Sequence, residues 1–156
     1  MKRFSGIFGL CMAWVVILSA PSAFAHCQVP CGIYNDEMRF EMIFEHITTI
    51  EKSMKAINEL ALSDKGNTNQ IVRWVSNKEH HAEEIQKIAT QYFLAQRIKP
   101  PKDTKEMPGY VESLKYIHQL VFFAMKAKQS TDLAHVKALK ETTEAYRALY
   151  RTMTGH

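Results

Sequence analysis

Apolar residues recur at alternating steps of four and three over the stretch from residue 43 to residue 61, a spacing that places them on one face of an α-helix. They are Ile43, Ile47, Ile50, Met54, Ile57 and Ala61. Asn35 is a favourable helix N-cap, and Asp36 and Glu37 place negative charge in the first turn. The sequence therefore predicts a long helix over about 36–62 that packs its apolar face against other helices.

Three more amphipathic segments follow, and turn residues separate them. We expect a second helix over about 69–96, ended by a pair of prolines, and a third over about 110–128. A fourth begins after a cap at Ser130 or Thr131. The residues expected to face inward are Ile71, Trp74, Val75, Ala82, Ile85, Ala89, Tyr92 and Phe93 in the second helix, Val111, Leu114, Ile117, His118, Val121 and Met125 in the third, and Val136, Leu139, Thr143, Tyr146, Tyr150 and Met153 in the fourth. No segment alternates like a strand, so the predicted fold class is all-α, an antiparallel up-down four-helix bundle.

The first 25 residues have the three parts of a secretory signal peptide. Lys2 and Arg3 form the charged start, an apolar run covers residues 7–19, and Ala23-Phe24-Ala25 supplies small residues before the cut. The apolar run is shorter than the roughly 20 residues of a membrane span. We therefore expect a signal or processing peptidase to remove residues 1–25. The product is one domain over 26–156, exported to a periplasmic or extracellular space, with no membrane attachment after processing.

The charge balance gives no reason to expect a nucleic-acid partner. The chain has a formal net charge of +4 at pH 7 with histidine neutral, and removal of the leader takes away two of the positive charges and no acid. A nucleic-acid surface is normally far more basic. A small positive field can instead help to draw in a small anion.

Residues 26–34 read His-Cys-Gln-Val-Pro-Cys-Gly-Ile-Tyr and directly follow the expected cut. Cleavage there gives His26 a free amine beside its imidazole, and the thiols of Cys27 and Cys31 lie in the same loop. No other stretch of the chain offers a metal ion comparable donors. In an exported protein the same two cysteines also suit a disulfide. The residue pattern therefore leaves two alternatives, a catalytic metal loop or a non-catalytic metal-binding or structural bundle with a Cys27–Cys31 disulfide.

The order His-Cys-x-x-Pro-Cys-Gly-x-Tyr at a newly made N-terminus resembles the nickel hook of the nickel-dependent superoxide dismutases. The matching residues are His26, Cys27, Pro30, Cys31, Gly32 and Tyr34. The hook fixes six residue types and also their position after a cleavage site, so the signal is specific. A Lys-Pro-Pro between the second and third helices is also shared.

The resemblance implies an enzyme that converts two superoxide ions and two protons to oxygen and hydrogen peroxide. One nickel ion per chain cycles between Ni(II) and Ni(III). The resemblance makes His26, Cys27 and Cys31 the metal ligands. The plane comprises the His26 amine, the Cys27 backbone nitrogen and both thiolates, and the His26 imidazole adds an axial ligand. Square-planar nitrogen and sulfur coordination suits nickel, whereas zinc prefers a tetrahedron.

The resemblance also assigns supporting roles. Tyr34 is expected near the open axial face, where it orders superoxide or water and helps to supply protons. Glu41 matches a family glutamate that holds the second ring nitrogen of the metal-bound histidine. In the family an arginine of the second helix supports this glutamate, and His81 stands at the comparable place here. Family members form homohexamers, so we expect a homo-oligomer.

A ferritin-like di-iron bundle is the other enzyme class that four helices suggest. It requires inward glutamates and Glu-x-x-His pairs on two helices. No Glu-x-x-His occurs in this sequence, so this reading is weak.

Overall fold

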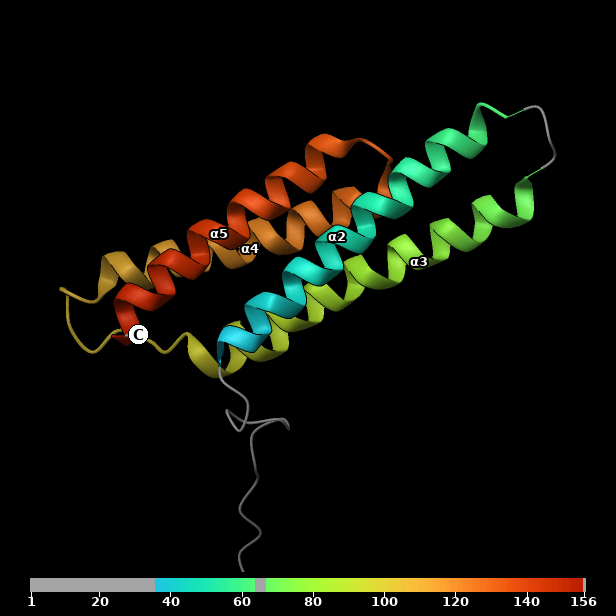
Figure 1. The fold of residues 1–156 in the computed structure, drawn as a ribbon. Helices are drawn as coiled ribbons and strands as arrows, with labels where there is room; N and C mark the ends of the chain where they lie inside the picture. Colours follow the sequence, from blue (N-terminus) through green and yellow to red (C-terminus); the bar gives the residue numbers. More distant parts are fainter. Residues whose placement is uncertain (1–35, 64–66, 156) are drawn as a thin grey trace, which may run out of the picture.

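The structure is a computed structural model, and it describes residues 36–63 and 67–155. The helices are α2 (Asp36–Ala61), α3 (Thr68–Lys87), α4 (Met107–Gln129) and α5 (Leu133–Thr154), and the π-helix η1 (Ile88–Arg97) continues directly from α3. Figure 1 shows α2 and α3 as one antiparallel hairpin packed beside a second hairpin made by α4 and α5. The predicted all-α up-down four-helix bundle is confirmed. Over the described part of the chain, no helix is both long and apolar enough to cross a membrane.

The apolar face predicted for the first helix forms the centre of the core. Ile43, Ile50 and Met54 are fully buried, whereas Ala61 at the end of the stripe is exposed. At the end of the bundle where α2 begins, the core is aromatic. The Phe40 ring lies 4.7 Å from the Phe93 ring and 5.6 Å from the Tyr146 ring, centroid to centroid. Such tilted contacts add to the stabilisation from burial. They pack η1 and α5 against the first turns of α2.

The inward face predicted for the third helix is partly wrong: Ile117 is buried and Val121 packs against the core, whereas Val111 and His118 are exposed. Its described core residues are Ser113, Ile117, Leu120, Ala124 and Ala127. Val111 is 53% exposed, and His118 is exposed with its ring stacked on Phe122. Helix α4 carries large apolar residues on more than one face, and the prediction followed the larger ones. The structure turns Ile117 and Leu120 inward together with the small residues Ser113, Ala124 and Ala127, which allow neighbouring helices to approach closely.

The start of the fourth helix also differs from the prediction. The N-cap is Asp132, whose carboxylate accepts a hydrogen bond from the Ala134 backbone N–H, and neither Ser130 nor Thr131 takes that position. Near the other end Met153, predicted to face inward, is 54% exposed. The helix therefore begins one or two residues later than expected, and its last apolar residue lies outside the core.

Lys78, in the polar middle of α3, is buried. Lys78 Nζ donates to the backbone carbonyls of Ala127 and Lys128, each at 2.7 Å, and of Ser130 at 2.9 Å. The last carbonyls of a helix have no partner within the helix. Burial lowers the pKa of Lys78, and the nearby Glu79 carboxylate acts against this shift. The side chain thus joins α3 to the C-terminal end of α4.

Replacing Lys78 should weaken this join. Lys78→Met should lower the free energy of unfolding by about 1–3 kcal/mol, because the buried carbonyls lose their donor. Urea unfolding of the chain 26–156, followed by circular dichroism, measures this change. Lys52→Met, at an exposed position on α2, is the matched control and should change little. Equal stability of the two variants would contradict the role given to Lys78.

Candidate metal centre and its supporting residues

The predicted ligands His26, Cys27 and Cys31, together with Tyr34, lie outside the described residues, so their geometry stays a prediction. The structure does describe the residue at which the helical bundle begins after this segment. That residue is Asp36, the first residue of α2 and the second residue after Tyr34.

Three side chains that are distant in the sequence meet on the Asp36 carboxylate. Its Oδ1 accepts from the Tyr92 hydroxyl and from Arg97 Nε, the latter at 2.9 Å. Its Oδ2 accepts from the Tyr150 hydroxyl at 2.5 Å. Arg97 Nη2 also donates to the Tyr92 hydroxyl at 2.8 Å. The first residue of α2 is therefore tied to η1 and to α5 by charge-assisted hydrogen bonds.

The π-helix explains how Tyr92 and Arg97 reach the same carboxylate. A π-helix closes its hydrogen bonds between residues five apart, and Tyr92 and Arg97 have that separation. The Arg97 guanidinium carbon lies 4.7 Å from the centre of the Tyr92 ring. The sequence prediction treated residues 69–96 as one α-helix, because the apolar pattern of η1 does not reveal the wider turn. The helix expected there is present, but the prediction missed the π-helix η1, which brings Tyr92 and Arg97 to the Asp36 carboxylate.

The ionisation of these groups follows from their contacts. Burial alone would raise the pKa of Asp36, but the hydrogen bonds from Tyr150, Tyr92 and Arg97 outweigh it and hold the pKa below its usual value. Burial and the Asp36 carboxylate raise the pKa of both Tyr92 and Tyr150. At neutral pH the carboxylate is thus ionised and both hydroxyls are protonated donors.

The predicted supporting residue Glu41 lies on α2 facing α5. Its side chain is 61% exposed, and its Oε1 accepts from Arg147 Nη2 at 2.6 Å. Arg147 also forms an ion pair with Glu37, and Arg151 Nη2 lies 2.8 Å from Glu37 Oε1. A carboxylate and arginine pair is therefore present, with the arginine supplied by α5. No local pattern links residues 41 and 147, so sequence reasoning could not find this partner.

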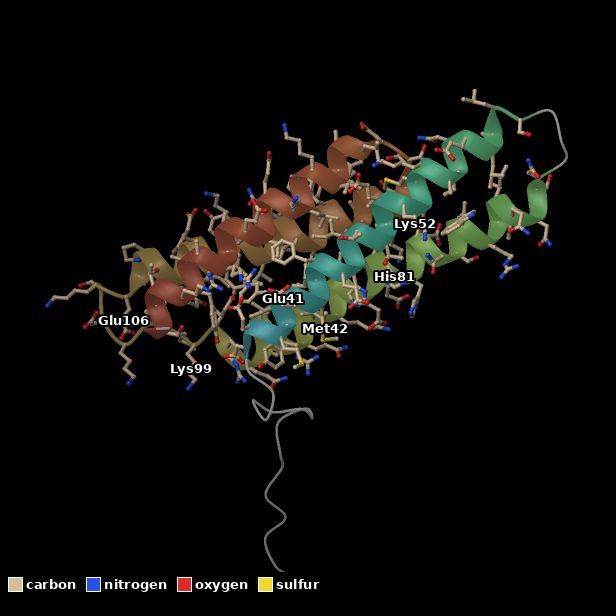
Figure 2. All side chains as sticks on the ribbon, viewed as in Figure 1. Glu41, Met42, Lys52, His81, Lys99 and Glu106 are labelled. Atoms are coloured by element: carbon tan, nitrogen blue, oxygen red, sulfur yellow. The ribbon has the colours of Figure 1, made fainter. Side chains whose placement is uncertain are left out.

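His81, considered as a replacement for the family arginine, has a different neighbour. Its Nδ1 lies 2.8 Å from His46 Nδ1, which joins α3 to α2. Figure 2 labels both Glu41 and His81, and their described partners lie on different helices, Arg147 on α5 and His46 on α2. Throughout 36–63 and 67–155, no three histidine, cysteine or acidic side chains are placed to hold a metal ion together.

A cavity of about 460 Å³ lies beside the Asp36 anchor, since Arg97 and Tyr150 contribute to its lining. Lys99, Lys102 and Lys105 also line it, and Glu106 is the acidic residue on its wall. The charged residues of its lining are therefore mostly basic, within a surface that is otherwise largely apolar. Such clustered cations raise the local concentration of small anions.

The described fold is an all-α four-helix bundle, and the sequence before it carries histidine and cysteine residues of the types that bind metal ions. The comparison with protein families makes this class specific. The family model for nickel-containing superoxide dismutase matches residues 21–153, and the chain belongs to this family. No curated protein and no solved structure matches the chain. The protein is an oxidoreductase that acts on superoxide with nickel as its cofactor.

Removing the Asp36 charge should loosen the anchor. Asp36→Asn should cost about 1.5–3 kcal/mol of unfolding free energy at pH 7, the range for hydrogen bonds to charged groups. Because the folded-state pKa of Asp36 is lowered, its contribution is complete above the ordinary pKa of 3.8 and is lost as the pH falls further. The stability gap between parent and variant should therefore be constant from about pH 5 to 7 and close towards pH 2.

Chemical unfolding of the chain 26–156 at several pH values measures that gap. Asp103→Asn, which alters an exposed loop carboxylate that accepts only backbone N–H groups in the described hydrogen bonds, is the control. A gap that stays constant down to pH 2 would show that the Asp36 pKa is not depressed.

Proposed function

We propose that the nickel ion of this enzyme is held by His26, Cys27 and Cys31 after residues 1–25 have been removed. The observation that carries the proposal is the hook sequence itself, six matching residue types placed after a signal cleavage site and inside the range of the family match. The anchored first turn of α2 supports it, because a loop that starts from a fixed point has fewer positions to sample.

The donor set fits nickel. Two thiolates, an amine and an imidazole are the sulfur and nitrogen ligands that suit a square-planar ion. When bound in such a set, nickel supplies a one-electron couple that can accept an electron from one superoxide and give it to the next. An α-amino group has a pKa of about 8, so the amine of His26 can lose its proton to a metal at modest cost. The amide of an unprocessed chain cannot replace it.

Other residues of the chain would order the reactants and the ligands. Tyr34 has a phenol that can donate a hydrogen bond to superoxide and pass on a proton. Glu41 can accept a hydrogen bond from the second ring nitrogen of His26, while its ion pair with Arg147 orients the carboxylate. The basic cavity beside Asp36 would concentrate an anionic substrate near the same end of the bundle.

Export follows from the leader. The charged start, the short apolar run and the small residues before His26 support secretion to a periplasmic or extracellular space and removal of the leader by a signal or processing peptidase. Removal is also what creates the His26 amine. Processing and activation are therefore one event in this proposal.

A homo-oligomer, expected to be a hexamer from the family resemblance, is supported by one end of the bundle. Figure 1 shows the far ends of α2 and α3 extending beyond the connection between α4 and α5. Large apolar side chains are exposed there: Leu62 is 88% exposed and Val72 is 57% exposed. A second copy that covers this end would remove apolar surface from water.

The first test measures metal content and superoxide dismutase activity on protein whose N-terminus is shown by mass spectrometry to be His26. We expect about one nickel per chain and activity that a nickel chelator removes. One extra residue before His26 should abolish turnover and leave the helicity unchanged, because the amine is replaced by an amide. A metal-free protein with Cys27 and Cys31 joined, inactive even after reduction and nickel loading, would overturn the proposal.

The supporting pair gives a separate prediction. Glu41→Gln should lower nickel affinity or activity about 10-fold or more, the usual cost of losing the partner of a metal-bound histidine. Arg147→Met should act in the same direction. The double variant should cost less than the two losses combined, because both remove one interaction. The electron paramagnetic resonance signal of the oxidised metal reports the histidine ligand independently of turnover.

Glu59→Gln, an exposed acid on the same helix, is the matched control for this pair and should match the parent. Parent-like affinity, activity and spectrum in Glu41→Gln would remove Glu41 from the site. The assignment of His26, Cys27 and Cys31 would be unaffected, since the metal and N-terminus measurements test it separately.

A further inference from the structure

The cavity of about 460 Å³ lies between the C-terminal end of α5 and the connection that joins η1 to α4. Figure 2 labels Lys99 and Glu106 on this connection. The cavity is far larger than superoxide, which has only two atoms, and it has the size of sites that hold small organic molecules. None of the described residues that line it is a predicted metal ligand. Its shape and chemistry therefore call for a ligand other than the substrate.

Three lysines at the mouth of the cavity have no acidic partner. Lys99, Lys102 and Lys105 are exposed, and none of them forms an ion pair with a residue in 36–63 or 67–155. The first turn of α4 adjoins them and carries no acidic residue. The positive end of the helix dipole therefore adds to the lysine charges there. An anionic group is favoured at this mouth.

The walls behind the lysines are largely apolar. Ile98, Pro100 and Pro101 come from the connection, and Met153 comes from α5. Gly109 keeps the opposite wall small, since a Cβ added there would lie 3.3 Å from the Met153 sulfur. A methionine sulfur makes favourable contacts with aromatic rings. These walls suit the flat apolar body of a ligand.

Tyr146 marks the inner end of the cavity, because it belongs to the lining and yet is 0% exposed. Its hydroxyl has no hydrogen-bond partner among the described residues. A buried hydroxyl without a partner is unfavourable. Burial, helped by Tyr150 and Asp36, raises the pKa of Tyr146, so the hydroxyl is a protonated donor at neutral pH. A ligand that brings an acceptor to this end would satisfy it.

We propose that this cavity binds a small aromatic hydroxy acid, a flat ring with a carboxylate at one end and a hydroxyl at the other. The carboxylate lies among the three lysines, the ring lies between the prolines and Met153, and the ligand hydroxyl accepts from the Tyr146 hydroxyl. The lysines attract any anion, but only a ligand with an apolar body and a second polar end uses the whole cavity. The site contains no nickel ligand and does not depend on the assignment of the hook.

The test titrates the chain 26–156 with para-hydroxybenzoate and follows the backbone amide signals by nuclear magnetic resonance. We expect saturable shifts concentrated in residues 97–113 and 146–154, which contain the lining. Benzoate and para-hydroxybenzyl alcohol each lack one polar end, and each should bind about fivefold more weakly, the loss of one hydrogen bond. Acetate, which has no ring, should leave these signals almost unchanged. This ligand series uses the unaltered chain, so it needs no variant to fold.

Tyr146→Phe tests the inner end. It should remove the preference for para-hydroxybenzoate over benzoate and leave benzoate binding nearly unchanged. It should not lower the free energy of unfolding, because the hydroxyl that it removes has no described partner. Tyr116→Phe, on α4 and outside the lining, is the matched control and should keep the preference.

The mouth is tested by two triple variants that remove the same charge. Replacing the three cavity lysines by glutamine should weaken both acids about fivefold or more, the combined effect of three exposed charges. The control triple, Lys52→Gln with Lys137→Gln and Lys140→Gln, lies outside the lining and should change little.

Three results would overturn the proposal. Equal weakening by the two triple variants would show a general effect of net charge. A preference for the hydroxy acid that survives Tyr146→Phe would place the ligand elsewhere. Shifts from para-hydroxybenzoate that do not saturate, or that match those from acetate, would show that the cavity has no organic ligand of this class.

Discussion

The carboxylate of Asp36 is the contact on which the functional end of the molecule depends. It begins α2, and it is held by Tyr92 and Arg97 from η1 and by Tyr150 from α5. An ionised carboxylate that is partly removed from water requires several donors to offset its lost hydration. The structure supplies them from two other elements. The N-terminal segment therefore departs from a point that three parts of the bundle define together.

How much of this could be read from the sequence depended on the size and separation of the residues involved. The α2 stripe was predicted because isoleucines at helical spacing can hardly face water. The α4 face was predicted only in part, because three of its five buried residues are small and the periodicity argument gave most weight to large apolar residues. Lys78 was part of a visibly polar stretch, but its three backbone acceptors come from another helix. The predicted metal ligands lie in one contiguous motif, so the sequence alone could propose them. They lie outside the residues that the structure describes.

The residues that would support the metal site depend on contacts between distant parts of the sequence, which the sequence alone does not reveal. Glu41 was predicted from its position after the hook, yet its arginine partner could not be, because Arg147 is 106 residues away in the sequence. The π-helical turn was equally hidden, since Tyr92 and Arg97 look like ordinary helix residues until the wider turn brings them to one carboxylate. The motif thus identifies the chemistry, and long-range contacts that no local pattern encodes decide how firmly the motif is supported.

Each residue that becomes ordered costs about 1–2 kcal/mol of backbone entropy. A metal site proposed on a short N-terminal segment therefore depends on metal binding and on a fixed attachment to the bundle to offset that cost. Asp36 and Glu41 lie within the first two turns of α2, and their partners come from η1 and α5. These contacts act on the part of the helix closest to the N-terminal segment. The His46–His81 hydrogen bond lies beyond those turns and joins α2 to α3. Helix α2 therefore presents its early turns to α5 and its middle to α3.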